Sequence, residues 1–296
     1  MIDGKRVLAV VPARGGSKGI YAYQFDPASG KLTEVGVAAE TPNPSFLTLH
    51  PKGNFLYAVN ELGTFKDQKS GSVTAFRTDP SSGKLQMLND QAAGGTSPCH
   101  LVVDKTGRNL LVVNYGTGSS AVFRLQSDGS LGERSAFIQH SGSGADQQRQ
   151  RGPHAHSVNL SKTQRYAIVG DLGTDEYIVY RFDAARGSLE RHGAAKVKAG
   201  QGPRHFAFAP NFKFGYGLNE MGSSVSVFNW DETAGSLTEI QNIRTLPEGF
   251  SATNNCSEVQ VHPNGRYLYA SNRGHDSLAM FSIDKGKLTS LGVLSG

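Results

Sequence analysis

Apolar and polar residues alternate with a period of two along most of the chain, in short runs separated by turns. Residues 46–60, FLTLHPKGNFLYAVN, show the recurring unit: a short strand, a turn at residues 51–54, and a second strand with a polar end. This alternation is typical of half-buried β-strands, and no window of useful length has helical periodicity. The pattern therefore predicts an all-β protein of short antiparallel strands.

Two phrases recur in turn along the chain. One is an aromatic strand, a turn, Gly-Lys-Leu or Gly-Ser-Leu, and a further strand; its leucines are Leu32, Leu85, Leu131, Leu189, Leu237 and Leu288. Successive leucines are 53, 46, 58, 48 and 51 residues apart. The strand–turn–strand unit lies between them, so each full repeat holds four strands. Four-stranded units with this period predict the blades of a β-propeller, whereas a β-sandwich of the same strands does not explain the period.

The chain holds about six such units, five complete and one partial. The complete units begin near Pro44, Pro98, Pro153, Pro203 and Cys256. The first unit lacks its innermost strand, and its second strand is the unusual VLAVVPAR of residues 7–14. Six units could close as a ring, but residues 293–296 are too short to supply a missing strand, so we expect an open ring with exposed strand edges. We divide the chain into an atypical N-terminal segment, residues 1–16, and an incomplete propeller domain, residues 17–296.

Residues 7–20, VLAVVPARGGSKGI, resemble the start of acylneuraminate cytidylyltransferases. A glycine-rich stretch cradles a phosphate when a helix follows it, because the amide groups of the first helical turn face the anion. The residues after Gly19 alternate as a strand instead. We therefore interpret residues 15–19 as a turn between two strands and not as a phosphate loop.

Charge and cysteine content narrow the classes of partner. The formal net charge is +5 and the isoelectric point about 9.1, but Lys and Arg are scattered, with no block of five. This charge pattern suits a small anionic substrate or a solvated basic surface, and no nucleic-acid motif accompanies it.

The two cysteines, Cys99 and Cys256, read as free thiols in a reducing compartment. No eighteen-residue apolar window exists. We expect a cytoplasmic protein without nucleic-acid or membrane partners, and the oligomeric state stays open.

From Ser17 onward the chain resembles the propeller-type lactonases, a family that includes bacterial 6-phosphogluconolactonases and fungal carboxymuconate-lactonising enzymes. The phrases that carry the resemblance are NPSFLTLHPKGNFLYAVNE, RQRGPHAHSV, GPRHFAFAPN and SEVQVHPNGRYLYASNRG. The resemblance implies a seven-bladed propeller with the site at one mouth of its channel, and no cofactor. It also implies a catalytic histidine, two arginines and a glutamate, which match His156, Arg204, Glu220 and Arg273.

Aligning the units places polar residues where a plain core would hold aliphatic ones. One inner-strand position holds Phe46, His100, Ser157, His205 and Glu258, and the position before it holds Ser45, Cys99, His156, Arg204 and Ser257. The second strands end at Glu61, Tyr115, Asp171, Glu220 and Arg273. Because buried charges need partners, such a cluster suggests a site. Six residues are candidates for substrate binding: Glu61, His100, Arg149, Gln150, His154 and His205.

These residue types suit the hydrolysis of a lactone. His156 has the right ordinary pKa for a general base, and Arg204 or Arg273 could stabilise an oxyanion or hold a phosphate. Glu220 could orient an arginine or act as an acid or base; an Arg204–Glu220 ion pair could also be purely structural. His154 and His156 share one face of a regular strand, which permits metal binding, but no third ligand has a telling spacing, so we expect no metal.

The polar segment of residues 141–152 reads as a mobile connector or a lid over the substrate, and the recurring Asn60, Asn114, Asn219 and Asn272 read as turn caps. We interpret the chain as a sugar-lactone hydrolase, with 6-phosphogluconolactone as the substrate implied by the resemblance. A carboxymuconate-type lactonising lyase and a non-catalytic interaction scaffold are the alternatives.

Overall fold

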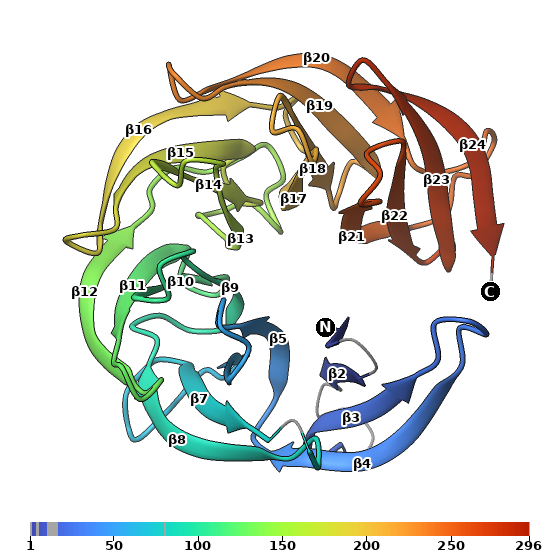
Figure 1. The fold of residues 1–296 in the computed structure, drawn as a ribbon. Helices are drawn as coiled ribbons and strands as arrows, with labels where there is room; N and C mark the ends of the chain where they lie inside the picture. Colours follow the sequence, from blue (N-terminus) through green and yellow to red (C-terminus); the bar gives the residue numbers. More distant parts are fainter. Residues whose placement is uncertain (1, 4–5, 11–16, 80, 296) are drawn as a thin grey trace. The chain divides into compact units, whose positions relative to one another are not determined.

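The computed structural model describes residues 2–3, 6–10, 17–79 and 81–295, for the first two ranges the backbone only. Across these ranges the regular elements are β-strands, which form six four-stranded sheets with consecutive strands paired (Figure 1). In this part of the chain there is no helix long and apolar enough to cross a membrane. The all-β prediction and the repeat of four strands are therefore confirmed.

The chain divides into two compact units, of which the first comprises Met1–Gln139 and Ala184–Ser188. Its first sheet contains β1 (Ile2–Asp3), β2 (Arg6–Val10), β3 (Gly19–Phe25) and β4 (Leu32–Glu40). The second contains β5 (Pro44–Leu49), β6 (Phe55–Asn60), β7 (Ser72–Thr78) and β8 (Leu85–Ala92). The third contains β9 (Pro98–Val103), β10 (Asn109–Asn114), β11 (Ser119–Leu125) and β12 (Leu131–Gln139). Buried aliphatic and aromatic side chains fill the space between neighbouring sheets.

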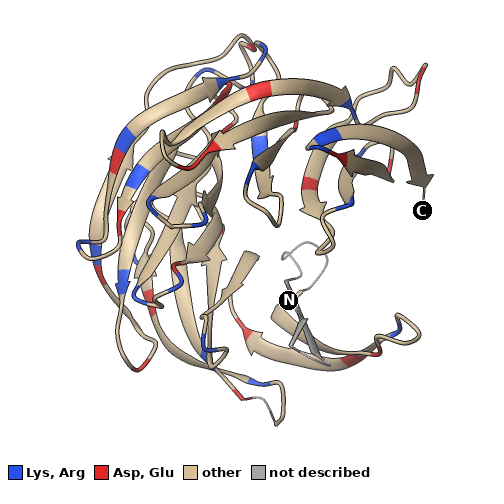
Figure 2. Ribbon diagram, turned by 45° about the horizontal axis from the view of Figure 1, so that its top comes forward, with Lys and Arg blue, Asp and Glu red and all other residues tan. Residues whose placement is uncertain are grey.

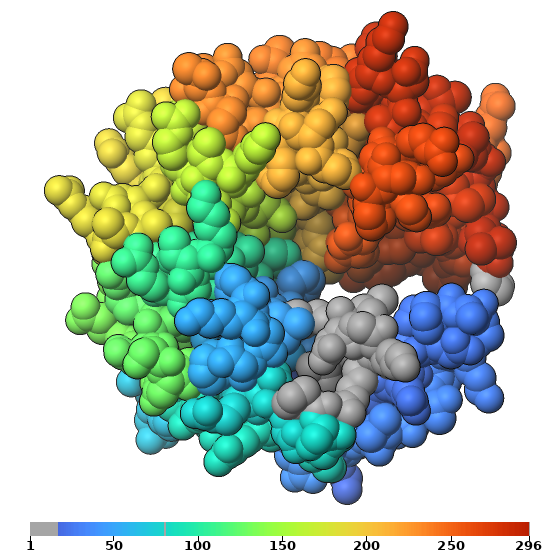
Figure 3. Space-filling model, viewed as in Figure 1, coloured from blue at the N-terminus to red at the C-terminus, as the bar shows by residue number. Residues whose placement is uncertain are grey.

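The second unit comprises His140–Asp183 and Leu189–Gly296. Its first sheet contains β13 (Ala155–Leu160), β14 (Tyr166–Asp171), β15 (Glu176–Asp183) and β16 (Ser188–Lys196). The second contains β17 (Pro203–Phe208), β18 (Phe214–Asn219), β19 (Ser224–Asp231) and β20 (Ser236–Arg244). The third contains β21 (Asn255–Val261), β22 (Tyr267–Arg273), β23 (Ser277–Asp284) and β24 (Lys287–Ser295). These sheets pack through two buried clusters, and their atoms form the yellow-green to red part of Figure 3.

The start of the chain differs from the prediction in one respect. The first sheet does have an innermost strand, β1, although it is only two residues long and pairs with β2. The second strand, β2, pairs with β3 from Arg6 to Val10, and the rest of its predicted range, residues 11–14, lies outside the described residues. The predicted turn of residues 15–19 falls largely on residues 11–16, which lie outside the described residues. The division at residue 16 therefore stays a prediction.

The ends of the second strands follow one rule in every complete sheet. Asn60, Asn114 and Asn219 pair with Pro44, Pro98 and Pro203, and their side chains bond to nearby turn and strand groups, as expected of turn caps. Asp171 pairs with Ala155 in the same way, so it belongs to this asparagine position. The sequence alignment, which grouped Asp171 with Glu220, was wrong by one residue; Leu172 is the true counterpart of Glu220.

Two structurally equivalent tyrosines differ in their hydroxyl contacts. On β6, the Tyr57 hydroxyl donates to the carbonyl oxygen of Gly129 over 3.0 Å, in the turn of the next sheet. On β18, the Tyr216 hydroxyl is buried without a partner among the described residues. A pocket of about 250 Å³ lies there, lined by Tyr216 and by Gly286 of the corresponding turn. The β23–β24 turn leaves the second hydroxyl unpaired.

This contrast predicts different costs for the same substitution. Tyr57→Phe should lower the free energy of unfolding by about 1 kcal/mol, because it leaves a buried carbonyl without its donor. Tyr216→Phe should change it by less than about 0.5 kcal/mol, because no bond is lost. Chemical denaturation followed by far-ultraviolet circular dichroism measures both. Equal losses in the two variants would contradict the assignment.

Candidate functional site

The inner strands of the second unit carry β-bulges near their starts. The residues that lie outside the regular pairing are His156 on β13, Arg204 and His205 on β17, and Ser257 and Glu258 on β21. A bulge interrupts the alternation of side chains and re-aims them. Because β17 packs between β13 and β21, the bulges bring polar residues from three sheets to one place.

The bulge also changes the predicted relation between His154 and His156. His154 precedes β13, where its amide donates to the Asp171 carboxylate over 2.8 Å. His156 is the extra residue of the bulge, so the two histidines do not follow the period of a regular strand. Among the described residues no group of three His, Cys, Asp or Glu side chains could hold a metal ion. The shared strand face that suggested a metal site is therefore absent.

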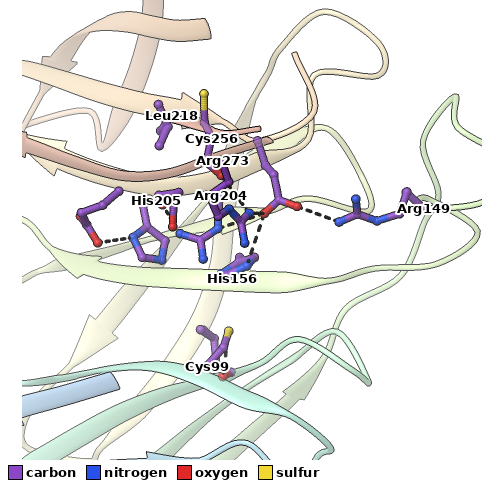
Figure 4. A network of polar contacts seen from close by, with 12 residues as sticks. Cys99, Arg149, His156, Arg204, His205, Leu218, Cys256 and Arg273 are labelled. Atoms are coloured by element: carbon purple, nitrogen blue, oxygen red, sulfur yellow. Dashed lines mark hydrogen bonds and ion pairs between the residues drawn. The ribbon is translucent and has the colours of Figure 1, made fainter. Parts of the chain in front are cut away.

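The carboxylate of Glu220 is the centre of the site, and Figure 4 labels its partners Arg149, His156, Arg204 and Arg273. Glu220 follows β18 directly, and its side chain is 6% exposed. Arg149 Nη2 donates to Oε1 over 2.8 Å, while Arg204 Nε and Arg273 Nη2 lie 2.9 and 3.1 Å from Oε2. His156 Nε2 lies 3.8 Å from the same Oε2 atom. Three guanidinium groups and one imidazole thus converge on one carboxylate.

The backbone of β21 holds two of these arginines in place. Arg204 Nη1 donates to the carbonyl oxygen of Ser257, and Arg273 Nη2 donates to that of Cys256 over 3.0 Å. The Cys256 amide in turn donates to the carbonyl oxygen of Glu220 over 3.0 Å. These bonds connect the carboxylate, two of its arginines and the neighbouring strand in one network. The positions of the charged groups are therefore set by main-chain contacts as well as by their mutual attraction.

A glycine on β14 allows β17 to approach this closely. Gly170 pairs with Ser157, beside the bulge of His156. A Cβ atom at this position would lie 2.9 Å from the carbonyl oxygen of Arg204. A larger residue would therefore push β17 away from β14 and separate Arg204 from His156.

The site has a drier and a wetter side. The side chains of His156 and Arg204 are 12% and 13% exposed, whereas those of Arg149 and Arg273 are 40% and 51% exposed.

The cluster carries a net positive charge, because three guanidinium groups against one carboxylate leave a formal excess of two positive charges. Such an excess favours the binding of an anion. Elsewhere in the protein, Lys and Arg are interspersed with Asp and Glu along the ribbon (Figure 2).

His205 forms a second contact at the edge of the cluster. Its Nδ1 atom lies 2.8 Å from Oε2 of Glu258, and its ring meets that of His156 edge to face with centroids 5.4 Å apart. Burial lowers the pKa of His205, and the positive charge of Arg204 lowers it further, although Glu258 acts in the opposite direction. A neutral imidazole that donates from Nδ1 to Glu258 fits these surroundings.

Arg149 comes from the segment of residues 141–152, which is held by many hydrogen bonds. The Asp146 carboxylate accepts bonds from the amides of Gln148 and Arg149, both over 2.8 Å. The buried Gln150 side chain donates to the carbonyl oxygen of Leu172 and to Asp175 over 2.7 and 2.8 Å. Backbone hydrogen bonds also lower the pKa of Asp146. These bonds anchor the segment beside Glu220, and the two readings of it, as a connector or as a lid over the substrate, stay predictions.

The structure brings together five of the predicted residues: His156, Arg204, Glu220, Arg273 and Arg149. His205 contacts the edge of this group, whereas Gln150 anchors the loop and does not face the cluster. Glu61 and His100 belong to the first unit. His100 stacks there on Phe46 with ring centroids 4.0 Å apart. The amide of Glu61 donates to the carbonyl oxygen of Asn43, and the Asn43 side-chain amide donates to the carbonyl oxygen of Glu61. Their predicted part in substrate binding stays a prediction.

Two features of the site were not predicted from the sequence. Glu258 was aligned with His205 but was not named as a site residue, although its carboxylate orients that imidazole. The backbone carbonyl groups of Cys256 and Ser257 were also missed. The alignment of the units contained a signal for Glu258, since it occupies the same inner-strand position. No sequence signal reveals a carbonyl group as a hydrogen-bond acceptor for arginine.

Comparisons with known proteins agree with this architecture. The family model described as "Lactonase, 7-bladed beta-propeller" matches residues 7–295. A 6-phosphogluconolactonase of Bacillus subtilis is 35% identical over 272 residues, which cover 92% of this chain and 76% of the relative. A 6-phosphogluconolactonase of Formosa agariphila is 35% identical over 274 residues, with coverages of 90% and 75%.

Solved structures also resemble this chain over most of its length. The periplasmic gluconolactonase of Pseudomonas aeruginosa aligns with a TM-score of 0.91 and 32% identity, covering 98% of this chain and 83% of that one. A protein from Lactobacillus plantarum aligns with a TM-score of 0.91 and 31% identity, covering 98% and 82%. These similarities extend over nearly the whole chain, so they concern its complete set of sheets.

The lowered pKa of His205 predicts a pH-dependent stability. The groups around this imidazole are Arg204, Glu258, Glu220 and His156. Because the folded state disfavours protonation of His205, the unfolded chain binds this proton more readily below the ordinary pKa of 6.5. The contribution of neutral His205 is therefore present above about pH 6.5 and is lost as the pH falls from there toward the lowered pKa of the folded state.

His205→Asn tests this contribution, because asparagine keeps an N–H donor for Glu258 but does not titrate. We expect the free energy of unfolding to fall less steeply below pH 6.5 in the variant than in the wild type. Denaturant titrations at pH 7.5 and at several values between 6.5 and 5 measure the difference. Parallel curves for the two proteins would rule out His205 as the titrating group.

Proposed function

The chain belongs to the lactonase family of seven-bladed β-propellers and is a sugar-lactone hydrolase, and we propose that it hydrolyses 6-phosphogluconolactone with His156, Arg204, Glu220 and Arg273 as its catalytic set. The observation that carries the proposal is the convergence of three guanidinium groups and an imidazole on the Glu220 carboxylate. This arrangement joins a general base, donors for an oxyanion, and an excess of positive charge.

Hydrolysis of a lactone requires a proton to leave the attacking water and a proton to reach the ring oxygen. In the proposed mechanism, Nε2 of His156 accepts a proton as the water oxygen attacks the carbonyl carbon. The carbonyl oxygen becomes an oxyanion, which Arg204 stabilises through its guanidinium group in the drier part of the site. When the ring C–O bond breaks, the imidazolium returns its proton to the leaving oxygen, which gives the open hydroxy acid.

We assign Glu220 a positioning role. Both of its oxygen atoms accept bonds from arginine N–H groups, and Oε2 contacts two guanidinium groups and lies near His156. A carboxylate used in this way holds like-charged groups at short range and aligns them for the substrate. The alternative role as acid or base, which the sequence left open, would require one of these oxygens to exchange protons with the substrate.

The anionic substrate follows from the charge of the cluster and from the relatives. The excess of two positive charges in the cluster, with Arg149 and Arg273 partly exposed, suits a phosphoryl group, and two relatives are named 6-phosphogluconolactonase. The same names favour hydrolysis over the lactonising direction, which would use the same groups in reverse. Cytoplasmic residence stays a prediction, because one structural neighbour is a periplasmic gluconolactonase.

Arg204→Ala tests the catalytic proposal. The variant loses a donor to the oxyanion, so kcat/KM for 6-phosphogluconolactone should fall about 100- to 1,000-fold. Rates are measured by proton release and corrected for spontaneous hydrolysis. Arg181→Ala is the matched control, because Arg181 is an exposed arginine of β15 in the same unit. Thermal melting establishes that both variants are folded, and Arg204→Lys replaces the alanine variant if that one is not.

We expect the wild-type rate to be insensitive to EDTA, since the proposed mechanism uses only side chains of the chain. Unchanged turnover in folded Arg204→Ala would remove this residue from the mechanism. A loss of activity with EDTA that is restored by a divalent cation would replace the proposed mechanism with a metal-dependent one.

Glu220→Gln separates positioning from acid–base catalysis. If Glu220 positions the arginines, kcat/KM should fall by about 100-fold, while its pH dependence keeps the shape of the wild-type profile. Glutamine has the size of glutamate but loses the charge that holds the guanidinium groups. The profile is measured between pH 5 and 8, where spontaneous hydrolysis can be subtracted. Disappearance of one limb of the profile would instead identify Glu220 as an acid or base.

A further inference from the structure

The three arginines around Glu220 are held in different ways. Arg204 and Arg273 come from strands, and each also donates to a carbonyl oxygen of β21. Arg149 comes from the loop of residues 141–152, and its guanidinium group reaches the cluster through the contact with Oε1 of Glu220. Its side chain is 40% exposed, in contrast to 13% for Arg204. Arg149 is thus the loop-borne cation on the wetter side of the site.

The Glu220 carboxylate separates Arg149 from the residues assigned to the reaction. Arg149 contacts Oε1, whereas Arg204 and His156 are nearest to Oε2. Figure 4 shows Arg149 at the opposite end of the polar network from His205, with Arg204 between them. A group bound by Arg149 would therefore lie away from the carbonyl that reacts beside His156 and Arg204. In a 6-phosphorylated sugar lactone the phosphoryl group extends from the ring on C6, several bonds away from the C1 carbonyl, so one molecule can contact both places.

The loop holds Arg149 ready for such contact. The amides of Arg149 and Gln148 donate to the Asp146 carboxylate. The next residue, Gln150, is held by its buried side chain, which donates to the Leu172 carbonyl oxygen and to Asp175. The base of the arginine is therefore fixed on both sides while its guanidinium group extends into the site. Preorganisation of this kind lowers the entropic cost of binding a ligand.

We propose that Arg149 binds the phosphoryl group of the substrate and thereby sets the preference for phosphorylated over neutral sugar lactones. The inference rests on the proposed function and assigns a role that the sequence left open. A planar guanidinium group binds phosphate oxygens in a bidentate manner, and such charge-assisted bonds are stronger than those between neutral groups. Arg273 is more exposed, but it contacts Oε2 of Glu220, the oxygen atom to which Arg204 and His156 are also nearest. It fits better as a fixed neighbour of the reacting carbonyl.

The test compares two substrates in matched variants. Arg149→Gln removes the proposed phosphate contact, and Arg151→Gln is the control, because Arg151 is an exposed arginine two residues further on the same loop whose Nε donates to the Gln147 carbonyl oxygen. Values of kcat/KM are measured for 6-phosphogluconolactone and for gluconolactone. The ratio of the two values should fall at least about 10-fold in Arg149→Gln and stay unchanged in Arg151→Gln. The ratio cancels any general loss of activity caused by movement of Glu220.

A binding measurement keeps the inference testable without turnover. Calorimetric titration with the products, 6-phosphogluconate and gluconate, should show that Arg149→Gln weakens the binding of 6-phosphogluconate at least about 10-fold and leaves the difference between the products smaller than in the wild type. Arg149→Lys, which keeps the charge but loses the planar donor fork, should lie between the wild type and the glutamine variant.

The outcomes separate this inference from the proposed function. An equal fall for both lactones in Arg149→Gln would overturn the inference and leave Arg149 as a partner of Glu220. Wild-type hydrolysis of gluconolactone without preference for the phosphorylated form would also overturn it, while the catalytic set stands. If the wild type hydrolyses neither lactone, the proposed function fails, and the product titrations decide the inference alone. Equal binding of 6-phosphogluconate by the wild type and Arg149→Gln would then reject it.

Discussion

One carboxylate makes the rest of this site physically possible. Three guanidinium groups a few ångströms apart repel one another, and burial strengthens the repulsion because protein screens charge less than water does. Glu220 lies between them and accepts bonds on both oxygen atoms. It compensates only one of the three charges, so the cluster stays positive. The arrangement is stable enough to fold and still attracts an anion.

The geometry that delivers these charges is built into the backbone. In each complete sheet a proline, alanine or cysteine near the start of the inner strand pairs with an asparagine or aspartate near the end of the second strand, and a bulge follows this pair. In the first unit the bulges of β5 and β9 hold Ser45 and Cys99, and in the second unit those of β13 and β17 hold His156 and Arg204. The same local fold thus presents serine or cysteine in the first unit and histidine, arginine or serine in the second, where the bulge of β21 holds Ser257. Function depends on which side chains occupy a repeated position.

The drier and wetter sides of the cluster give its groups different roles. An oxyanion is stabilised best where water is excluded and the donors are fixed in advance, as for Arg204 with its bond to the Ser257 carbonyl oxygen. An anion that must enter and leave is served better by a partly exposed cation such as Arg149. Exposure together with the carboxylate oxygen that each guanidinium group contacts distinguishes these roles, since both residues are arginines on the same carboxylate.

The sequence by itself determined the type of strand, the four-strand repeat and the residues that occupy equivalent positions, because alternation and period are local properties of the chain. It predicted the set of His156, Arg204, Glu220 and Arg273 through the resemblance to the lactonase family, and the alignment of repeats placed these four residues at equivalent positions. The alignment shifted Asp171 by one residue relative to Glu220, and the pattern predicted that His154 and His156 share one face of a strand. Gln150 was predicted to bind the substrate. Only the tertiary structure decided these points. A bulge breaks the period of two, and the partners of a side chain such as Gln150 or Glu258 come from segments that are distant in sequence and adjacent only after the sheets have packed.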